Sequence, residues 1–88
     1  MKSIMNPRPI AVRALANYEL EIRFSNGESR IFDMKPHLEF GIFRELKDDG
    51  YFSRACIQNG TVTWPNEQDV CPDTLYEESR PAKRDGAA

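Results

Sequence analysis

The chain has 88 residues, which allows one domain. A domain of this size buries only about 60% of the surface that its unfolded chain exposes, so a homodimer or a protein partner that adds burial is physically reasonable. Twelve basic and fourteen acidic side chains give a net charge of −2, unlike the strongly basic balance of most nucleic-acid binders.

The basic residues gather near the C-terminus, where Arg80, Lys83 and Arg84 stand with one acid, Asp85. Without these four residues, nine basic and thirteen acidic side chains leave a net charge of −4. We therefore expect that the folded part does not bind nucleic acid. The basic tail alone would give only a weak, salt-sensitive attraction.

No apolar run is long enough to span a bilayer, and no apolar signal core stands near the start. The sequence predicts a soluble cytoplasmic protein without a membrane partner. Cys56 and Cys71 have neither the CxxC spacing nor a metal-ligand spacing. We expect two reduced, inert thiols, no metal and no other cofactor.

In chain order, residues 1–8 carry a proline but no periodic pattern, which predicts a loose lead-in whose natural start is Met1 or Met5. Residues 10–15 predict a first strand, turned back by Ala16-Asn17. Residues 18–34 predict a hairpin, because apolar and charged residues alternate up to the turn at Asn26-Gly27.

The register of that hairpin decides which residues reach the core. A two-residue loop would set Leu20 opposite Asp33 and bury a carboxylate. A three-residue loop with Gly27 in a bulge sets Leu20 opposite Phe32 and Ile22 opposite Arg30. We prefer the second register, because the stem of Arg30 can cover Ile22 while the guanidinium stays in water.

Lys35-Pro36 ends the third strand, and the apolar period then changes to three and four. This pattern predicts a short helix over residues 42–47 that lays Ile42, Phe43 and Leu46 on the sheet. Asp48-Asp49-Gly50 is expected to close the helix with a turn.

Asn59-Gly60 marks a second hairpin, in which Gln58 pairs with Thr61 and the pairs continue outward to Ala55 with Trp64. Pro72 favours the start of a last helix over residues 73–78. Residues 80–88 are expected to be a disordered tail. The sequence thus predicts one compact α+β domain over residues 9–79, with a mainly antiparallel sheet of about five strands and two short helices, one packed on the sheet.

Asp33, His37 and Asp69 are the residues that could serve acid–base chemistry. No Ser or Cys nucleophile is tied to them by a motif, and a single histidine with scattered acids is not a metal site. We predict no catalytic residue. An ordinary surface role is the simpler interpretation of His37, and Asp33 is expected to cap the turn at Lys35-Pro36.

A group of aromatic, proline and acidic residues near the C-terminus is the candidate for binding a partner. Trp and Tyr suit interface anchors, and an acidic rim favours a basic partner. The alternatives are that Trp64 plugs the core and that the acids are ordinary surface. The candidates are Trp64, Pro65, Asp69, Pro72, Asp73 and Tyr76.

Several segments together resemble a known family. They are the run L-x-I-x-F-x-N-G-E from Leu20 to Glu28, then Phe32-Asp33-Met34, Gly41-x-Phe43-x-x-Leu46, and Val62-x-Trp64-Pro65-Asn66…Asp69-x-x-Pro72-Asp73-x-Leu75-Tyr76. These segments resemble the small bacterial family of unknown function labelled DUF2442.

The resemblance covers residues 9–79 and implies a compact α+β domain, found alone or joined to a helix-turn-helix module, in genes beside small toxin-like proteins. Few residues follow Glu78, so we expect no such module here and carry over no DNA-binding role. The family implies no catalytic residue.

We therefore expect a non-enzymatic interaction or regulatory domain, in the manner of an antitoxin that binds a small basic protein. The alternatives are a regulator that responds to nucleic acid through its basic tail or to a small molecule, and a hydrolase-type enzyme that uses His37 and Asp33.

Overall fold

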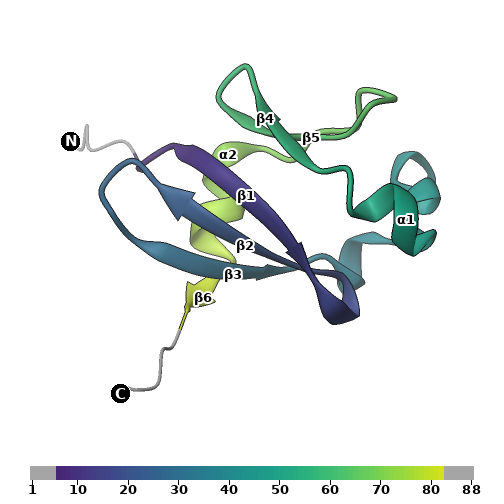
Figure 1. The fold of residues 1–88 in the computed structure, drawn as a ribbon, viewed down its shortest axis with the longest axis horizontal. Coiled ribbons are helices and arrows are strands. Elements are labelled where there is room, and N and C mark those ends of the chain that lie inside the picture. The colour runs from purple at the N-terminus through teal and green to yellow at the C-terminus, as the bar shows by residue number, and fades with distance from the viewer. Residues whose placement is uncertain (1–5, 83–88) are drawn as a thin grey trace.

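A computed structural model describes residues 6–82 of the chain. Four antiparallel strands form one sheet in the order β1-β2-β3-β6, and two further strands form a separate hairpin (Figure 1). The first sheet comprises β1 (Pro9–Leu15), β2 (Glu19–Phe24), β3 (Ser29–Asp33) and β6 (Arg80–Pro81), and the hairpin comprises β4 (Cys56–Gln58) and β5 (Thr61–Thr63). The α+β class is confirmed, with six strands in two sheets where about five were expected.

Two short α-helices and three 3₁₀ helices connect the strands. They are α1 (Asp49–Phe52), α2 (Pro72–Glu77) and the 3₁₀ helices Ala16–Tyr18, Lys35–His37 and Gly41–Lys47. The helix that lies on the sheet is α2, behind β2 and β3 in Figure 1, whereas α1 lies at one end of the sheet. No helix within residues 6–82 is long and apolar enough to cross a membrane.

The register of the central hairpin is the one preferred from the sequence. Leu20 faces Phe32 and Ile22 faces Arg30 across β2 and β3. The amide of Gly27 donates to the carbonyl of Phe24 at 2.9 Å, and Gly27 has φ +92°. Glycine takes this left-handed conformation at no steric cost, so the three-residue loop holds the register.

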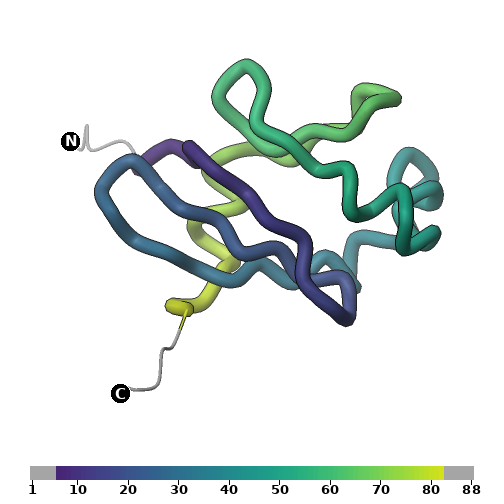
Figure 2. Tube along the Cα trace, in the orientation of Figure 1, coloured from purple at the N-terminus to yellow at the C-terminus, as the bar shows by residue number. Residues whose placement is uncertain are grey.

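One face of the first sheet carries the core. Fully buried side chains of β2 and β3 meet the hydrophobic side chains of α1, α2 and the second hairpin. The helices α1 and α2 and the second hairpin all follow β3 in the sequence, as the tube in Figure 2 shows. The largest fully buried side chains are Phe24, Phe32 and Phe52, with Leu20, Ile22, Met34, Leu46 and Leu75.

The helix expected over residues 42–47 differs in type and in the face it buries. Residues Gly41–Lys47 form a 3₁₀ helix, in which Phe43 and Leu46 are buried but Ile42 is 65% exposed. A 3₁₀ helix has three residues per turn, so positions 43 and 46 share its buried face and position 42 points outward. The predicted burial of Ile42 is therefore wrong.

The turn expected at Asp48-Asp49-Gly50 is instead the start of α1. Asp48 is the N-cap of this helix, and its carboxylate accepts the amide of Tyr51 at 3.2 Å. A side-chain oxygen at this position satisfies an amide that has no partner within the helix. This cap lets Gly50 lie inside a helix that propensity alone disfavours.

The second hairpin pairs as predicted from Gln58–Thr61 to Cys56–Thr63. The expected Ala55–Trp64 pair does not continue this ladder, because the amide of Trp64 donates to the carbonyl of Gln68 at 3.0 Å. Figure 1 shows this hairpin beyond β1, and its strands pack beside β1 without backbone pairing.

The prediction of a disordered tail over residues 80–88 is wrong for its first residues. Arg80 and Pro81 pair with Ile31 and Arg30 of β3, and the amide of Ala82 donates to the carbonyl of Ser29 at 2.9 Å. Residues 83–88 lie outside the described residues.

The lead-in expected over residues 1–8 is tied to the fold at its far end. The side-chain amide of Asn6 donates to Glu77 at 3.0 Å, and the backbone amide of Arg8 donates to Ser25 Oγ at 3.0 Å. Residues 1–5, and with them the choice between Met1 and Met5, lie outside the described residues.

Candidate functional site

The six candidate residues do not form one patch. Trp64, Pro65 and Asp69 line a hollow of about 650 Å³ on the second hairpin. Pro72 and Asp73 line a different, smaller hollow of about 120 Å³ near the start of β1. The remaining candidate, Tyr76, packs edge-on against Phe24 with 5.1 Å between the ring centroids.

Trp64 belongs to the core. Its side chain is buried, its ring stacks 6.0 Å from that of Phe52, and its indole nitrogen Nε1 donates to the carbonyl of Phe52 at 2.9 Å. The hydrogen bond satisfies the one polar atom of the side chain. Trp64 therefore closes the hollow at one side and is no exposed anchor.

Tyr76 lies under a half-buried cation. The guanidinium of Arg30 sits 4.7 Å from the centre of the Tyr76 ring, and its Nε and Nη2 donate to Ser79 Oγ and O at 2.7 and 2.8 Å. Hydrogen bonding between the Tyr76 hydroxyl and the Glu28 carboxylate raises the pKa of Tyr76 and lowers the pKa of Glu28. Arg30, Tyr76 and Ser79 thus hold α2 against β3.

The hollow on the second hairpin, which we call the hairpin hollow, is polar and acidic. It is lined by Cys56, Gln58, Asn59, Thr63, Trp64, Pro65, Glu67 and Asp69. Two carboxylates lie among these eight residues, and no basic side chain does. Amide and hydroxyl groups supply further hydrogen-bond acceptors. This arrangement can receive a cationic group such as the side chain of lysine or arginine.

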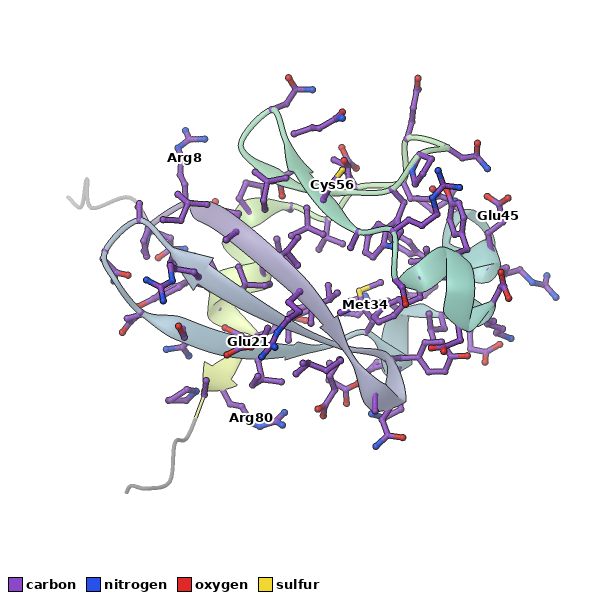
Figure 3. All side chains as sticks on the ribbon, in the orientation of Figure 1. Arg8, Glu21, Met34, Glu45, Cys56 and Arg80 are labelled. Atoms are coloured by element: carbon purple, nitrogen blue, oxygen red, sulfur yellow. The ribbon has the colours of Figure 1, made fainter. Side chains whose placement is uncertain are left out.

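The turn from Trp64 to Gln68, which carries the acidic wall of the hairpin hollow, is held by a network around Glu45. Asn66 Nδ2 donates to both carboxylate oxygens of Glu45 at 2.9 Å, and Gln68 Nε2 donates to Glu45 Oε1 at 2.7 Å. Glu45 lies on the 3₁₀ helix at the α1 end of the molecule (Figure 3). The turn therefore rests on an element about twenty residues earlier in the sequence.

The hydroxyl of Tyr51 completes this network. It accepts the backbone amide of Asn66 at 2.8 Å and donates to Gln68 Oε1 at 2.7 Å. Glu67, between these two residues, has φ +72°, an uncommon conformation for a residue other than glycine. The surrounding hydrogen bonds fix the backbone in that conformation and so fix where Glu67 stands.

Glu45, Tyr51 and Gln68 were missed by sequence reasoning. The segment Trp64-Pro65-Asn66 was singled out, but nothing in its spacing names the residues that support it. Asn66 itself was the one sign of this network in the sequence, because an amide side chain next to a proline turn needs hydrogen-bond partners elsewhere in the fold.

Asp33, His37 and Asp69 do not assemble into an acid–base site. The ring of His37 stacks on Phe32 at 5.4 Å, and its Nε2 lies 3.5 Å from Glu78. Asp33 accepts the Lys35 amide at 2.9 Å, as a turn cap, and Asp69 lines the hairpin hollow. Burial raises the pKa of Asp33, but the hydrogen bonds and charge of Lys35 outweigh it and hold the pKa below its usual value.

No group of three or more His, Cys, Asp or Glu side chains within residues 6–82 is arranged to hold a metal ion. Both thiols are free: Cys56 is half-buried on the hairpin (Figure 3), and Cys71 is exposed. The sulfur of Cys56 lies 3.7 Å from Thr63 Oγ1, inside the wall of the hairpin hollow.

DUF2442 is a protein family of unknown function, and the sequence model of this family matches residues 9–81 of the chain. These residues include both sheets and all the helices of the structure. The chain belongs to the DUF2442 family. No curated protein and no solved structure matches this DUF2442 domain. The match includes β6, which the boundary expected at residue 79 left out. Because the family has no assigned function, the function of this DUF2442 domain has to be argued from its surface.

Proposed function

We propose that this DUF2442 domain is a non-enzymatic interaction domain that binds a cationic segment of another protein at the hairpin hollow. The observation that carries the proposal is the acidic wall itself, where Glu67 and Asp69 line one hollow without a basic neighbour among its lining residues. A lysine or arginine side chain entering the hollow would meet both carboxylates.

The fixed backbone around these acids supports a binding role. Binding costs less free energy when the recognising groups are already ordered, because less conformational entropy is lost. Asn66 and Gln68, on either side of Glu67, both bond to Glu45. Asp69 forms a bridge with Thr63 of β5. The acids are therefore presented by a preorganised turn, as designed binding sites require.

An antitoxin-like role, in which the partner is a small basic protein, is the specific form of this proposal. The net charge of −2 favours association with a basic protein. Of the residues predicted from the sequence, Pro65 and Asp69 line the hairpin hollow, and Trp64 closes it from the core. The proposal therefore leaves out Pro72, Asp73 and Tyr76, which do not line this hollow.

The experiment compares immobilised wild-type protein with two variants of equal charge. In the double variant Glu67→Gln, Asp69→Asn the hollow loses its acids. In the matched control Glu39→Gln, Asp49→Asn two exposed acids outside the hollow are lost. From native lysate at low salt, we expect a basic protein on the wild type and the control, with strong depletion on the first variant and release by salt.

Equal recovery of that protein on all three baits, or no protein on the wild type, would refute the proposal. A circular dichroism spectrum of each variant establishes that it is folded. The same charge change in both variants separates a local requirement for Glu67 and Asp69 from a general effect of net charge.

No observation favours the alternatives to the same degree. A nucleic-acid role through the basic tail would use Arg80, but its guanidinium lies 3.3 Å from the carboxylate of Glu19 across the sheet. Lys83 and Arg84 lie outside the described residues. An enzyme using His37 and Asp33 would need these side chains to act together, and each has other partners.

A further inference from the structure

The structure contains two Asn-Gly turns with different hydrogen bonding. In the first, the Asn26 side-chain oxygen accepts the amide of Glu28 at 3.0 Å, and the Gly27 amide donates to Phe24 at 2.9 Å. The side chain of Asn26 and the backbone amide of Gly27 are therefore both held in hydrogen bonds.

The second turn leaves the equivalent groups free. Asn59 and Gly60 both have positive φ, 54° and 79°, as in a two-residue type I′ loop. Within the described part of the chain, neither the Asn59 side chain nor the Gly60 amide has a hydrogen-bond partner. Asn59 is also exposed, so water reaches its amide.

A cation stands beside this second turn. A Cβ built on Gly60 would lie 3.1 Å from Nη1 of Arg8, so the guanidinium lies beside the glycine. Figure 3 shows Arg8 extending from the start of β1 toward the hairpin side of the molecule. A positive charge at this place stabilises negative charge that develops on the glycine nitrogen or on the asparagine oxygen.

We propose that Asn59 is a site of spontaneous deamidation, assisted by Arg8, whereas Asn26 is protected. The backbone nitrogen of Gly60 attacks Cγ of Asn59 and forms a new bond to it, while the bond from Cγ to the amide nitrogen Nδ2 breaks. Ammonia leaves with the proton of the Gly60 amide, and a five-membered succinimide remains. Water then opens either carbonyl–nitrogen bond of the ring and gives aspartate or isoaspartate at position 59.

The product changes the hairpin hollow, because Asn59 is one of its lining residues. Deamidation adds a negative charge to a wall that already carries Glu67 and Asp69. If the hollow binds a cationic segment, as in the proposed function on which this step rests, aged protein with aspartate at position 59 binds that segment more tightly. Isoaspartate adds a methylene to the backbone and disturbs the two-residue loop.

The experiment follows both asparagines in the same protein by peptide mapping and mass spectrometry during incubation in mildly alkaline buffer. Deamidation is detected as an increase in peptide mass. In folded protein we expect this reaction at position 59 to be about tenfold faster than at position 26, because one nearby exposed charge and a free amide can change a rate by about this factor. In urea the two sites should react at similar rates, because each is an Asn-Gly pair in an unfolded polypeptide.

The Arg8→Gln variant tests the assistance. We expect slower reaction at position 59 and an unchanged rate at position 26, which acts as the internal control. Equal rates at the two positions in folded wild type, a faster rate at position 26, or an Arg8→Gln variant that reacts as fast as wild type would each overturn the proposal. None of these rates depends on a partner, so the result is separable from the proposed function.

Discussion

The Tyr51 hydroxyl gives the most direct test of how the turn beside the hairpin hollow is held. Tyr51→Phe removes one oxygen and two hydrogen bonds, those to Asn66 and Gln68. Gln68 is 6% exposed, so its Oε1 would lose its partner out of reach of water. Leaving such a group unsatisfied costs about 1–3 kcal/mol, whereas water can replace the partner of the exposed Asn66 amide.

We therefore expect Tyr51→Phe to lower the free energy of unfolding by about 2 kcal/mol, because one buried acceptor dominates the loss. For a domain of this size the change corresponds to a fall in Tm of about 10 °C. Urea denaturation followed by circular dichroism measures the free energy, and a thermal scan measures Tm. A loss below about 0.5 kcal/mol would show that the network does not stabilise the turn.

A double-mutant cycle isolates the network. Glu45→Gln weakens the bonds that Asn66 and Gln68 donate to the carboxylate. Because Tyr51 and Glu45 share these two partners, their effects should not add, and the coupling should exceed about 0.5 kcal/mol. Additive effects would mean that the two sides of the turn are held independently.

Three further outcomes are expected. Asp33 has a lower pKa folded than unfolded, so its ionised form stabilises the protein at neutral pH, and this stabilisation disappears as the pH falls below its ordinary value of 3.8 and through the folded value. Acid titrations of stability should accordingly show a shallower loss in Asp33→Asn than in wild type. Ile42→Ser should change stability by less than about 0.5 kcal/mol and Leu46→Ala should cost about 2–5 kcal/mol, measured by urea denaturation, because only Leu46 is buried. Deletion from Arg80 onward should cost about 1–2 kcal/mol in the same assay, since it removes β6 and its hydrogen bonds, whereas a true tail could be removed at no cost.

Local patterns predicted the hairpins because their information is local. The alternation around Leu20 and Ile22 and the two Asn-Gly turns decide strand, turn and register within a few residues, and the paired residues match apart from Ala55 with Trp64. The separation of the hairpins into two sheets could not be read in this way. It depends on how β4 and β5 pack beside β1, which no periodicity encodes.

The segment around Ile42 shows the limit of periodicity. Apolar residues at spacings of three and four suggest a helix without distinguishing an α-helix from a 3₁₀ helix, and the two bury different positions. Arg80 and Pro81 show a second limit of sequence patterns. Nothing in this dipeptide predicts a strand, and it becomes one because it pairs with the free edge of β3.

Composition predicted candidate residues but not their burial. Asp69 and Pro65 line a hollow, whereas composition alone could not show that Trp64 is inside and that Tyr76 lies under Arg30. Sequence reasoning gives residues that suit an interface, and burial decides which of them are available. Glu45 was invisible for the same reason, because its role is defined by two amides more than twenty residues away.

The division into two sheets has a consequence for motion. The β4–β5 hairpin shares no strand pairing with the four-stranded sheet, whereas β2 is paired along both edges. Units with few shared backbone bonds open locally at lower free energy than the global transition. Amide protons of β4 and β5 should therefore exchange with deuterium ahead of those of β2.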